Sequence, residues 1–203
     1  MAGHNILEGV VILHETIHEL HRKNLNGIIF KIDFEKSYDK VRWPFLCQTL
    51  RMKGFSPKWI QWVQNFISGG SVAINVNDEV GHFFQTKKGL RQGDPLSPLL
   101  FNIVADMLAI LIKRANEDGQ MISGVVPPSS GGLSVLQYAD DSILFMEHNL
   151  DQARNLKLLF FAFEQASGLK INFHKSEIYC FGEAKERKTS ILSILDVDLE
   201  TFL

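Results

Sequence analysis

The chain has 203 residues, a formal net charge of −2, 45% hydrophobic residues and 22% charged residues. This length allows one sizeable domain with its own core, and the composition excludes an intrinsically disordered chain. Because the balance of charge is slightly acidic, any nucleic-acid binding has to rest on local basic patches or on metal ions. The 2 cysteines are too few for a disulfide framework, which predicts a reducing, intracellular compartment.

The most apolar stretch of the chain, residues 96–112, is interrupted by Pro98, Asn102 and Asp106. These residues predict a buried helix rather than a membrane span. The N-terminus has no basic segment ahead of an apolar run, so no secretory signal is expected. We therefore expect a protein of the cytoplasm or nucleus with no membrane partner.

The first half of the chain alternates helical and extended patterns. Apolar residues recur at helical spacing over residues 6–22, and residues 28–32 form a short β-branched and aromatic run that ends on Asp33. Proline starts and glycine stops predict two helices, over residues 44–51 and 57–67. Residues 72–76 alternate in polarity and predict one strand of a hairpin, with residues 82–86 as its partner.

The second half begins with a polar loop, residues 87–94, ahead of the apolar helix. Apolar runs at residues 133–137 and 142–146 flank residues 138–141, so a hairpin with two adjacent carboxylates at its turn is predicted. A helical stripe ends at Gly168, two short strands follow (170–173 and 177–181), and the remainder is a polar tail. This order predicts an α+β fold with a central, largely antiparallel sheet backed by helices.

Three acidic residues, Asp33, Asp140 and Asp141, stand at the edges of apolar strands. Aspartate is depleted in strands, and two adjacent carboxylates repel each other unless a cation lies beside them. Mg²⁺ takes oxygen ligands, and carboxylates from two strand ends can hold a pair of ions suited to phosphoryl transfer. A polar hairpin turn is the simpler interpretation of Asp140 and Asp141 taken alone.

Four segments, taken in order, resemble the motifs of non-LTR (LINE-type) retrotransposon reverse transcriptases, especially those of plants. They are residues 31–41 (KIDFEKSYDKV), 89–98 (GLRQGDPLSP), 138–141 (YADD) and 167–172 (SGLKIN), the last followed by Lys175 and Ser176. The resemblance covers residues 2–182. It implies the palm of an RNA-directed DNA polymerase, which transfers dNTPs onto the 3′-hydroxyl of a DNA primer along an RNA template.

The resemblance also implies a metal centre and a proton donor. Asp33 and Asp140 would ligate two Mg²⁺ ions, with Asp141 assisting and with Mn²⁺ as a substitute. Lys175 matches the lysine that protonates the leaving pyrophosphate. A solvated surface lysine is the alternative interpretation of Lys175.

Five residues match nucleotide-binding or template-binding positions of the family: Phe34, Tyr38, Arg91, Gln92 and Gly93. Phe34 would add its backbone carbonyl as a ligand, and the ring of Tyr38 would exclude a ribose 2′-hydroxyl. Gln92 and Gly93 would lie under the incoming nucleotide and template base. Without the motifs, Tyr38 is an ordinary core aromatic and residues 87–94 are a solvated loop that leads into a helix.

Other chemistry has little support in the sequence. The 7 histidines and 2 cysteines show no zinc-ligand spacing, and no P-loop is present. Trp43, Trp59 and Trp62 have no assigned chemistry, and the spacing of Trp59 and Trp62 favours core packing.

The family pattern divides the chain into a remnant of the fingers (1–26), the palm (27–182) and a polar tail leading toward a primer grip and thumb (183–203). His4 and Ser37 stand where the family has arginine and alanine. With little of the fingers and no thumb, an alternative function is a catalytically inactive, truncated retroelement product with at most weak nucleic-acid binding. An unrelated two-metal phosphotransferase on a palm-like fold is a third hypothesis.

Overall fold

The structure is a computed structural model that describes residues 6–118, 135–138, 141–186 and 188–197. For residues 6–8, 138 and 141 it describes the backbone only.

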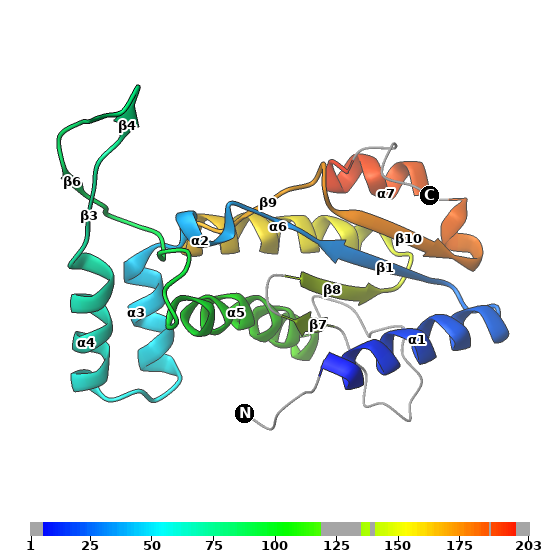
Figure 1. Cartoon of the computed structure of the whole chain (residues 1–203). Coiled ribbons are helices and arrows are strands. Elements are labelled where there is room, and N and C mark those ends of the chain that lie inside the picture. Colours follow the sequence, from blue (N-terminus) through cyan, green and yellow to red (C-terminus); the bar gives the residue numbers. More distant parts are fainter. Residues whose placement is uncertain (1–5, 119–134, 139–140, 187, 198–203) are drawn as a thin grey trace.

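A four-stranded antiparallel sheet with the strand order β10-β1-β8-β7 forms the centre of the molecule (Figure 1). The inner strands are β1 (Gly27–Ile32) and β8 (Asp141–Met146), and the outer strands are β10 (Glu177–Phe181) and β7 (Val135–Tyr138). The register places Ile32 opposite Ser142, and Tyr138 opposite Asp141. The predicted central antiparallel sheet and the predicted carboxylate-bearing hairpin strands are therefore confirmed.

One face of the sheet carries the main core, formed with α3 (Trp43–Met52), α5 (Ser97–Glu117) and α6 (Leu150–Ser167). Successive side chains of a strand point to opposite faces, so Ile28, Phe30 and Ile32 all enter this core. Phe30 contacts Phe160 of α6 with a ring-centroid distance of 5.9 Å. Full burial of one such side chain contributes about 1.5–3 kcal/mol to folding.

The opposite face of the sheet is partly covered by α1 (Ile6–Arg22), the helix predicted for this segment. Leu20 of α1 is buried together with Ile29 of β1 and Phe145 of β8, which makes a second, smaller core. α1 therefore closes only part of this face, as Figure 1 shows.

Beyond α3, the chain forms α4 (Pro57–Ser68), which starts where Ser56 accepts a hydrogen bond from the Trp59 backbone N–H. α4 lies beside α3 at one end of the molecule (Figure 1). A narrow hairpin, residues 71–85, then projects away from the body. We call this hairpin the arm; its paired segments are β3 (Ser71–Val72) with β6 (Phe84–Gln85) and β4 (Asn75–Val76) with β5 (Glu79–Val80).

The arm confirms the predicted hairpin but is less regular than its alternating sequence indicates. Its four strand segments have only two residues each. At its tip, Asn77 and Asp78 have positive φ angles of 50° and 66°, as a tight two-residue hairpin turn requires.

Two short elements join the sheet to the helices. β2 (Phe34–Glu35) pairs with β9 (Lys170–Ile171), which is shorter than the strand expected over residues 170–173. The helix α2 (Ser37–Lys40) follows β2 and was not predicted, because a single turn has no periodic pattern to detect.

The C-terminal segment corrects one expectation. Residues 183–203 were expected to be a polar tail, but the chain forms a 3₁₀ helix (Gly182–Lys185) and then α7 (Lys188–Leu195). Ile191, Leu192 and Leu195 of α7 are buried in the main core. The first three residues of α7 are polar, whereas its apolar residues follow at helical spacing and face α6. The proposed domain boundaries themselves stay predictions.

None of the described helices has the length and apolar character needed to cross a membrane.

Candidate functional site

Asp33 comes directly after the last residue of β1, and continuing the register by one residue sets its backbone level with Asp141 at the start of β8. Both polar groups of the Asp33 backbone are engaged. Its N–H donates to Ser176 Oγ at 3.1 Å, and its carbonyl accepts from the Asn172 N–H at 2.8 Å. The carboxylate is half-buried and has no hydrogen bond or ion pair with any residue that the structure describes. Asp33 is thus a fixed position that carries an uncommitted charge.

Of the other two predicted carboxylates, that of Asp140 lies outside the described residues. For Asp141, only the backbone is described. The backbone of Asp141 pairs with Tyr138, and only Ala139 and Asp140 separate these two residues in the sequence.

Metal binding fits the donors at this end of the sheet. Among the described side chains, no three His, Cys, Asp or Glu residues gather as a metal site, but the carboxylates of Asp140 and Asp141 are outside that set. Asp33 offers an uncommitted oxygen donor level with Asp141. This is the kind of ligand that Mg²⁺ uses, since Mg²⁺ sites in proteins have one or two carboxylates and keep several waters.

A turn over residues 172–176 supports Asp33 from the adjacent segment. Ser176 is fully buried, and its hydroxyl donates to the Asn172 carbonyl at 2.8 Å while accepting from the Asp33 N–H. Lys175, the predicted proton donor, lies in this turn with an exposed side chain, and its N–H donates to the Asn172 carbonyl at 3.1 Å. The segments that carry Lys175 and Asp33 are therefore joined by the hydrogen bond between the Asp33 N–H and the hydroxyl of Ser176.

Glu35, two residues after Asp33, has a different role from Asp33. Its carboxylate accepts hydrogen bonds from Lys40 at 2.9 Å and from Lys170 at 3.2 Å. These two hydrogen bonds, that from Lys40 first, hold the pKa of Glu35 below its usual value. Glu35 thus ties β2 to β9 and is not a free ligand.

Phe34 and Tyr38 connect the carboxylate end of the site to the core. The Phe34 ring is buried, with ring-centroid distances of 6.4 Å to both Phe101 and Phe163. The Tyr38 ring is half-buried and stacks on Phe101 at 5.0 Å. Tyr38 therefore packs against the core in this structure, and part of its side chain is exposed. The predicted contact with a nucleotide sugar stays a prediction.

The loop of residues 87–94 is bound to the segment that follows Asp33. The Leu90 N–H donates to the Tyr38 carbonyl at 2.7 Å, the Gly89 N–H donates to the Val41 carbonyl at 2.8 Å, and the Trp43 indole N–H donates to the Gly89 carbonyl at 2.7 Å. Gly89 has φ +87°, and a Cβ there would lie 2.7 Å from the Asp39 carbonyl oxygen. Only glycine allows this approach.

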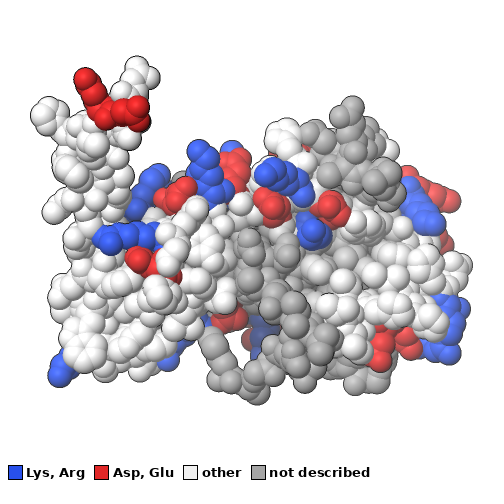
Figure 2. Space-filling view, viewed as in Figure 1, with Lys and Arg blue, Asp and Glu red and all other residues white. Residues whose placement is uncertain are grey.

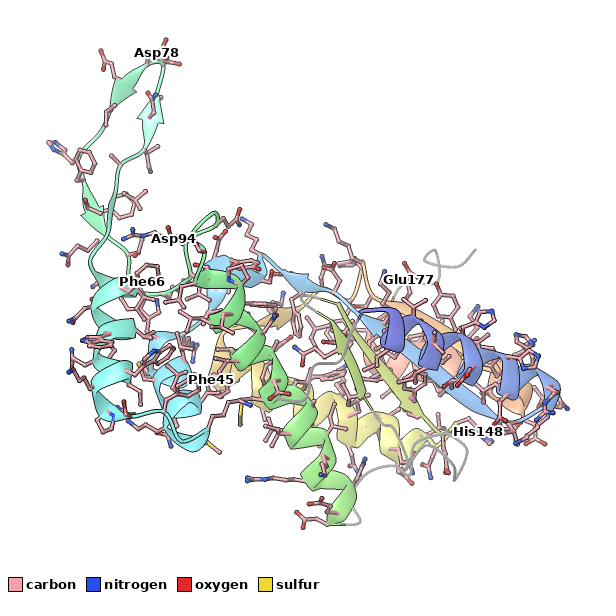
Figure 3. The ribbon with its side chains drawn as sticks, turned by 60° about the horizontal axis from the view of Figure 1, so that its bottom comes forward. Phe45, Phe66, Asp78, Asp94, His148 and Glu177 are labelled. Atoms are coloured by element: carbon pink, nitrogen blue, oxygen red, sulfur yellow. The ribbon has the colours of Figure 1, made fainter. Side chains whose placement is uncertain are left out.

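The same loop lines a cavity of about 510 Å³ at the base of the arm, where Figure 3 shows Phe66 and Asp94 near each other. Lys88, Arg91 and Gln92 also line this cavity. Gln92 and Gly93 are exposed, and Gly93 has φ +92°. Two of the predicted nucleotide-binding and template-binding residues, Arg91 and Gln92, therefore line one cavity, and Gly93 follows them in the chain.

Arg91 reaches back across the end of α4. A Cβ on Gly70 would lie 1.4 Å from Arg91 Nη2, so the guanidinium occupies space that any other residue at position 70 would fill. Arg91 is exposed and has no ion pair with any residue in the described part of the chain. On the face drawn in Figure 2, Lys and Arg side chains are interleaved with Asp and Glu side chains. Positive charge is therefore confined to small patches, in keeping with the net charge of −2.

The predicted site residues thus form two groups that share the segment 33–43. Asp33 and Lys175 belong to the sheet end. Arg91, Gln92 and Gly93 belong to the loop, which Leu90 binds to the Tyr38 carbonyl. The parts played by Ser176 and Trp43 are visible only in the structure. For Ser176, the available signal is its place directly after Lys175, behind the fourth motif segment.

Comparison with known proteins gives a consistent picture. Residues 1–195 match the family described as "Reverse transcriptase (RNA-dependent DNA polymerase)". The chain is 28% identical over 190 residues to the Retrovirus-related Pol polyprotein from type-2 retrotransposable element R2DM of Drosophila melanogaster, covering 90% of this chain and 16% of that protein. It is 34% identical over 95 residues to an uncharacterized mitochondrial protein of Arabidopsis thaliana, covering 47% of this chain and 77% of that protein.

A further relative is the transposon TX1 149 kDa protein of Xenopus laevis, 25% identical over 90% of this chain. The chain spans only 16% and 14% of the Drosophila and Xenopus proteins. The predicted resemblance to non-LTR retrotransposon reverse transcriptases is therefore confirmed.

Solved telomerase structures share the fold. Apo telomerase of Candida tropicalis, truncated from its C-terminal domain, superposes with a TM-score of 0.61 at 18% identity, over 88% of this chain and 36% of that chain. Telomerase of Candida albicans gives a TM-score of 0.61 at 14% identity, over 84% and 29%. At these identities the match concerns the fold, which is the α+β palm of a polymerase. With its family match over residues 1–195 and this palm, the chain belongs to the reverse transcriptase (RNA-dependent DNA polymerase) family.

Proposed function

We propose that this palm catalyses RNA-directed DNA synthesis, in which a dNTP is added to the 3′-hydroxyl of a DNA primer along an RNA template. One observation carries the proposal: the half-buried carboxylate of Asp33 is uncommitted among the described residues, on a backbone fixed at both its N–H and its carbonyl. A half-buried charge without a partner is less well solvated than an exposed one and favours an accompanying cation, and this position faces the strand that follows Asp140.

Asp33, Asp140 and Asp141 would hold two Mg²⁺ ions, with Mn²⁺ as a substitute. When bound, such ions lower the pKa of the primer hydroxyl and neutralise charge on the triphosphate. The protein's own part is to hold these carboxylates rigidly, and the hydroxyl of Ser176 contributes to that by accepting from the Asp33 N–H. Positioning supplies much of the rate in this chemistry.

The remaining residues would bind and orient the substrates. Arg91 and Lys88 offer positive charge to phosphates at the cavity, and Gln92 and Gly93 would lie beneath the nucleotide and template base. Tyr38, held against Phe101, would exclude a ribose 2′-hydroxyl, and Lys175 would give a proton to the leaving pyrophosphate.

The proposed partners are an RNA template, a DNA primer and dNTPs, within the cytoplasm or nucleus. A telomerase of the same fold, that of Candida tropicalis, is known in complex with a fragment of telomeric RNA, which supports an RNA partner. The two free cysteines, Cys47 and Cys180, fit a reducing compartment.

The test is primer extension on an RNA template with Mg²⁺. Asp33→Asn removes the charge but keeps the shape, so incorporation is expected to fall by at least about 100-fold. Asp151→Asn is the matched control, because Asp151 is an exposed carboxylate at the start of α6, away from the site. It is expected to leave incorporation unchanged.

A second comparison separates catalysis from its alternative. If the wild type incorporates no more dNTP than a variant with both Asp140→Ala and Asp141→Ala, the polymerase proposal is wrong for this chain. Weak binding of an RNA·DNA duplex by both proteins would then identify an inactive retroelement product.

A further inference from the structure

We propose that Trp43 is a positioning residue for the nucleotide and template site, because its indole N–H clamps the loop of residues 87–94 through the Gly89 carbonyl. The inference rests on the proposed polymerase function. It assigns chemistry to a tryptophan that the sequence motifs leave unexplained, 46 positions away from its partner.

The base of the clamp is rigid. Trp43 is the first residue of α3, and Pro44 follows within the first turn of that helix, where its fixed φ favours helical geometry. The preceding residue, Arg42, is bound to the end of α6: its N–H donates to the Ser167 carbonyl at 2.8 Å and its guanidinium donates to the Gln165 carbonyl. Trp43 therefore projects from the junction of two core helices.

The other side of the clamp is a short exposed loop with few anchors. Leu90 is 3% exposed and supplies the apolar anchor, and its N–H is bound to Tyr38. Gly89 is held through both its N–H and its carbonyl. The residues on either side, Lys87–Lys88 and Arg91–Gly93, are exposed.

The indole bond holds the second polar group of the peptide that joins Gly89 to Leu90, because Tyr38 already binds the N–H of this peptide. The loop donates its Gly89 N–H to Val41 and its Leu90 N–H to Tyr38. Trp43 instead donates to the loop, through the Gly89 carbonyl. Without the indole bond, this peptide keeps only the bond from the Leu90 N–H to the Tyr38 carbonyl, so its tilt is less restricted, and a change of tilt alters the direction in which Arg91 and Gln92 leave Leu90. Groups that bind the substrate equally in the ground state and the transition state change KM when they are displaced, with little change in kcat.

The decisive variant is Trp43→Phe, which keeps an aromatic ring against the core but removes the N–H donor together with part of the ring. Trp59→Phe is the matched control, because Trp59 stacks on Phe55 at 4.6 Å and its indole has no hydrogen bond with any described residue. Two readouts are needed: steady-state dNTP incorporation on an RNA template, and amide hydrogen exchange of the loop.

We expect Trp43→Phe to raise KM for the dNTP about 10-fold or more, with a smaller change in kcat, since the loop groups that bind the dNTP are displaced while the carboxylates are not. Exchange of the Gly89 and Leu90 amides should become about 10-fold faster while amides of α5 and α6 keep their protection. Trp59→Phe should leave both readouts within about twofold of wild type.

Either of two outcomes overturns the proposal: wild-type KM and kcat in Trp43→Phe, or unchanged exchange of the loop in that variant. Equal changes of KM and of loop exchange in Trp59→Phe would also overturn it, since they would show that Trp43 acts only through packing of its ring. If the wild type itself extends no primer, the proposed function fails separately, and loop exchange alone decides whether the clamp exists.

Discussion

Asp33 and Glu35 lie two residues apart, yet their surroundings give their carboxylates different roles. Glu35 is neutralised by Lys40 and Lys170, which fasten β2 to β9. Asp33 has no such partner among the described residues, while its backbone is fixed by Ser176 and Asn172. One carboxylate is therefore structural, and the other remains available to a cation.

The hydroxyl of Ser176 provides a test of this support. Ser176→Ala would leave the partly buried Asp33 N–H without its acceptor, so the free energy of unfolding should fall by about 1–3 kcal/mol in urea denaturation. Ser68→Ala is the matched control, because Ser68 also donates to a carbonyl four residues earlier but is exposed on α4. The control should change stability by less than about 0.5 kcal/mol. Equal losses in the two variants would contradict the role assigned to Ser176.

At the scale of elements, the end of α6 joins the fourth motif segment to the first. Gly168 ends the helix with φ +81°, and the Arg42 N–H donates to the Ser167 carbonyl beside it. A Cβ on Gly168 would lie 2.3 Å from the Lys40 carbonyl oxygen. The chain segments that carry Asp33 and Lys175 can therefore pack together only over a glycine.

Two glycine substitutions separate backbone strain from collision. Gly54 has almost the same φ, +82°, but a Cβ there would meet nothing within 4 Å. Gly54→Ala should thus cost about 1–3 kcal/mol from the left-handed conformation alone. Gly168→Ala adds a clash with backbone and should cost more than about 4 kcal/mol, measured by thermal or urea unfolding. Similar costs for both would show that the approach of Gly168 to Lys40 is unimportant.

At the scale of the whole molecule, the arm is the part least supported by the core. Its apolar side chains face solvent, with exposed fractions of 62% for Ile74, 64% for Val80 and 71% for Phe83. A two-stranded hairpin is only marginally stable by itself, and an exposed apolar hairpin with free edges favours association.

We therefore expect the isolated chain to self-associate through the arm as concentration rises. Combining Ile74→Thr with Phe83→Ser should reduce association, measured by light scattering, and leave the unfolding midpoint within a few degrees, because exposed sites contribute little to stability. The control combines Met52→Gln with Leu158→Gln, which removes two exposed apolar side chains elsewhere. Association that falls equally in both variants would show that the arm has no special part.

Local signals in the sequence were sufficient for most of the fold. Pro57 with Ser56 ahead of it marks the start of α4, Gly168 marks the end of α6, and the apolar run before Asp33 marks β1. Each of these signals acts within a few residues, through capping, restricted φ or side-chain periodicity. The sequence signal for α7 is weak, because the helix has only 8 residues and its first three, Lys188 to Ser190, are polar.

The sequence by itself determined the order of the elements, the family and the identity of the candidate carboxylates, because motifs and periodicity are contiguous along the chain. Only the tertiary structure decided that Ser176 supports Asp33 across 143 positions, that Trp43 binds Gly89 and that Gly70 leaves room for Arg91. These contacts depend on how helices and strands pack, and a hydrogen bond between distant residues leaves no pattern in either segment alone.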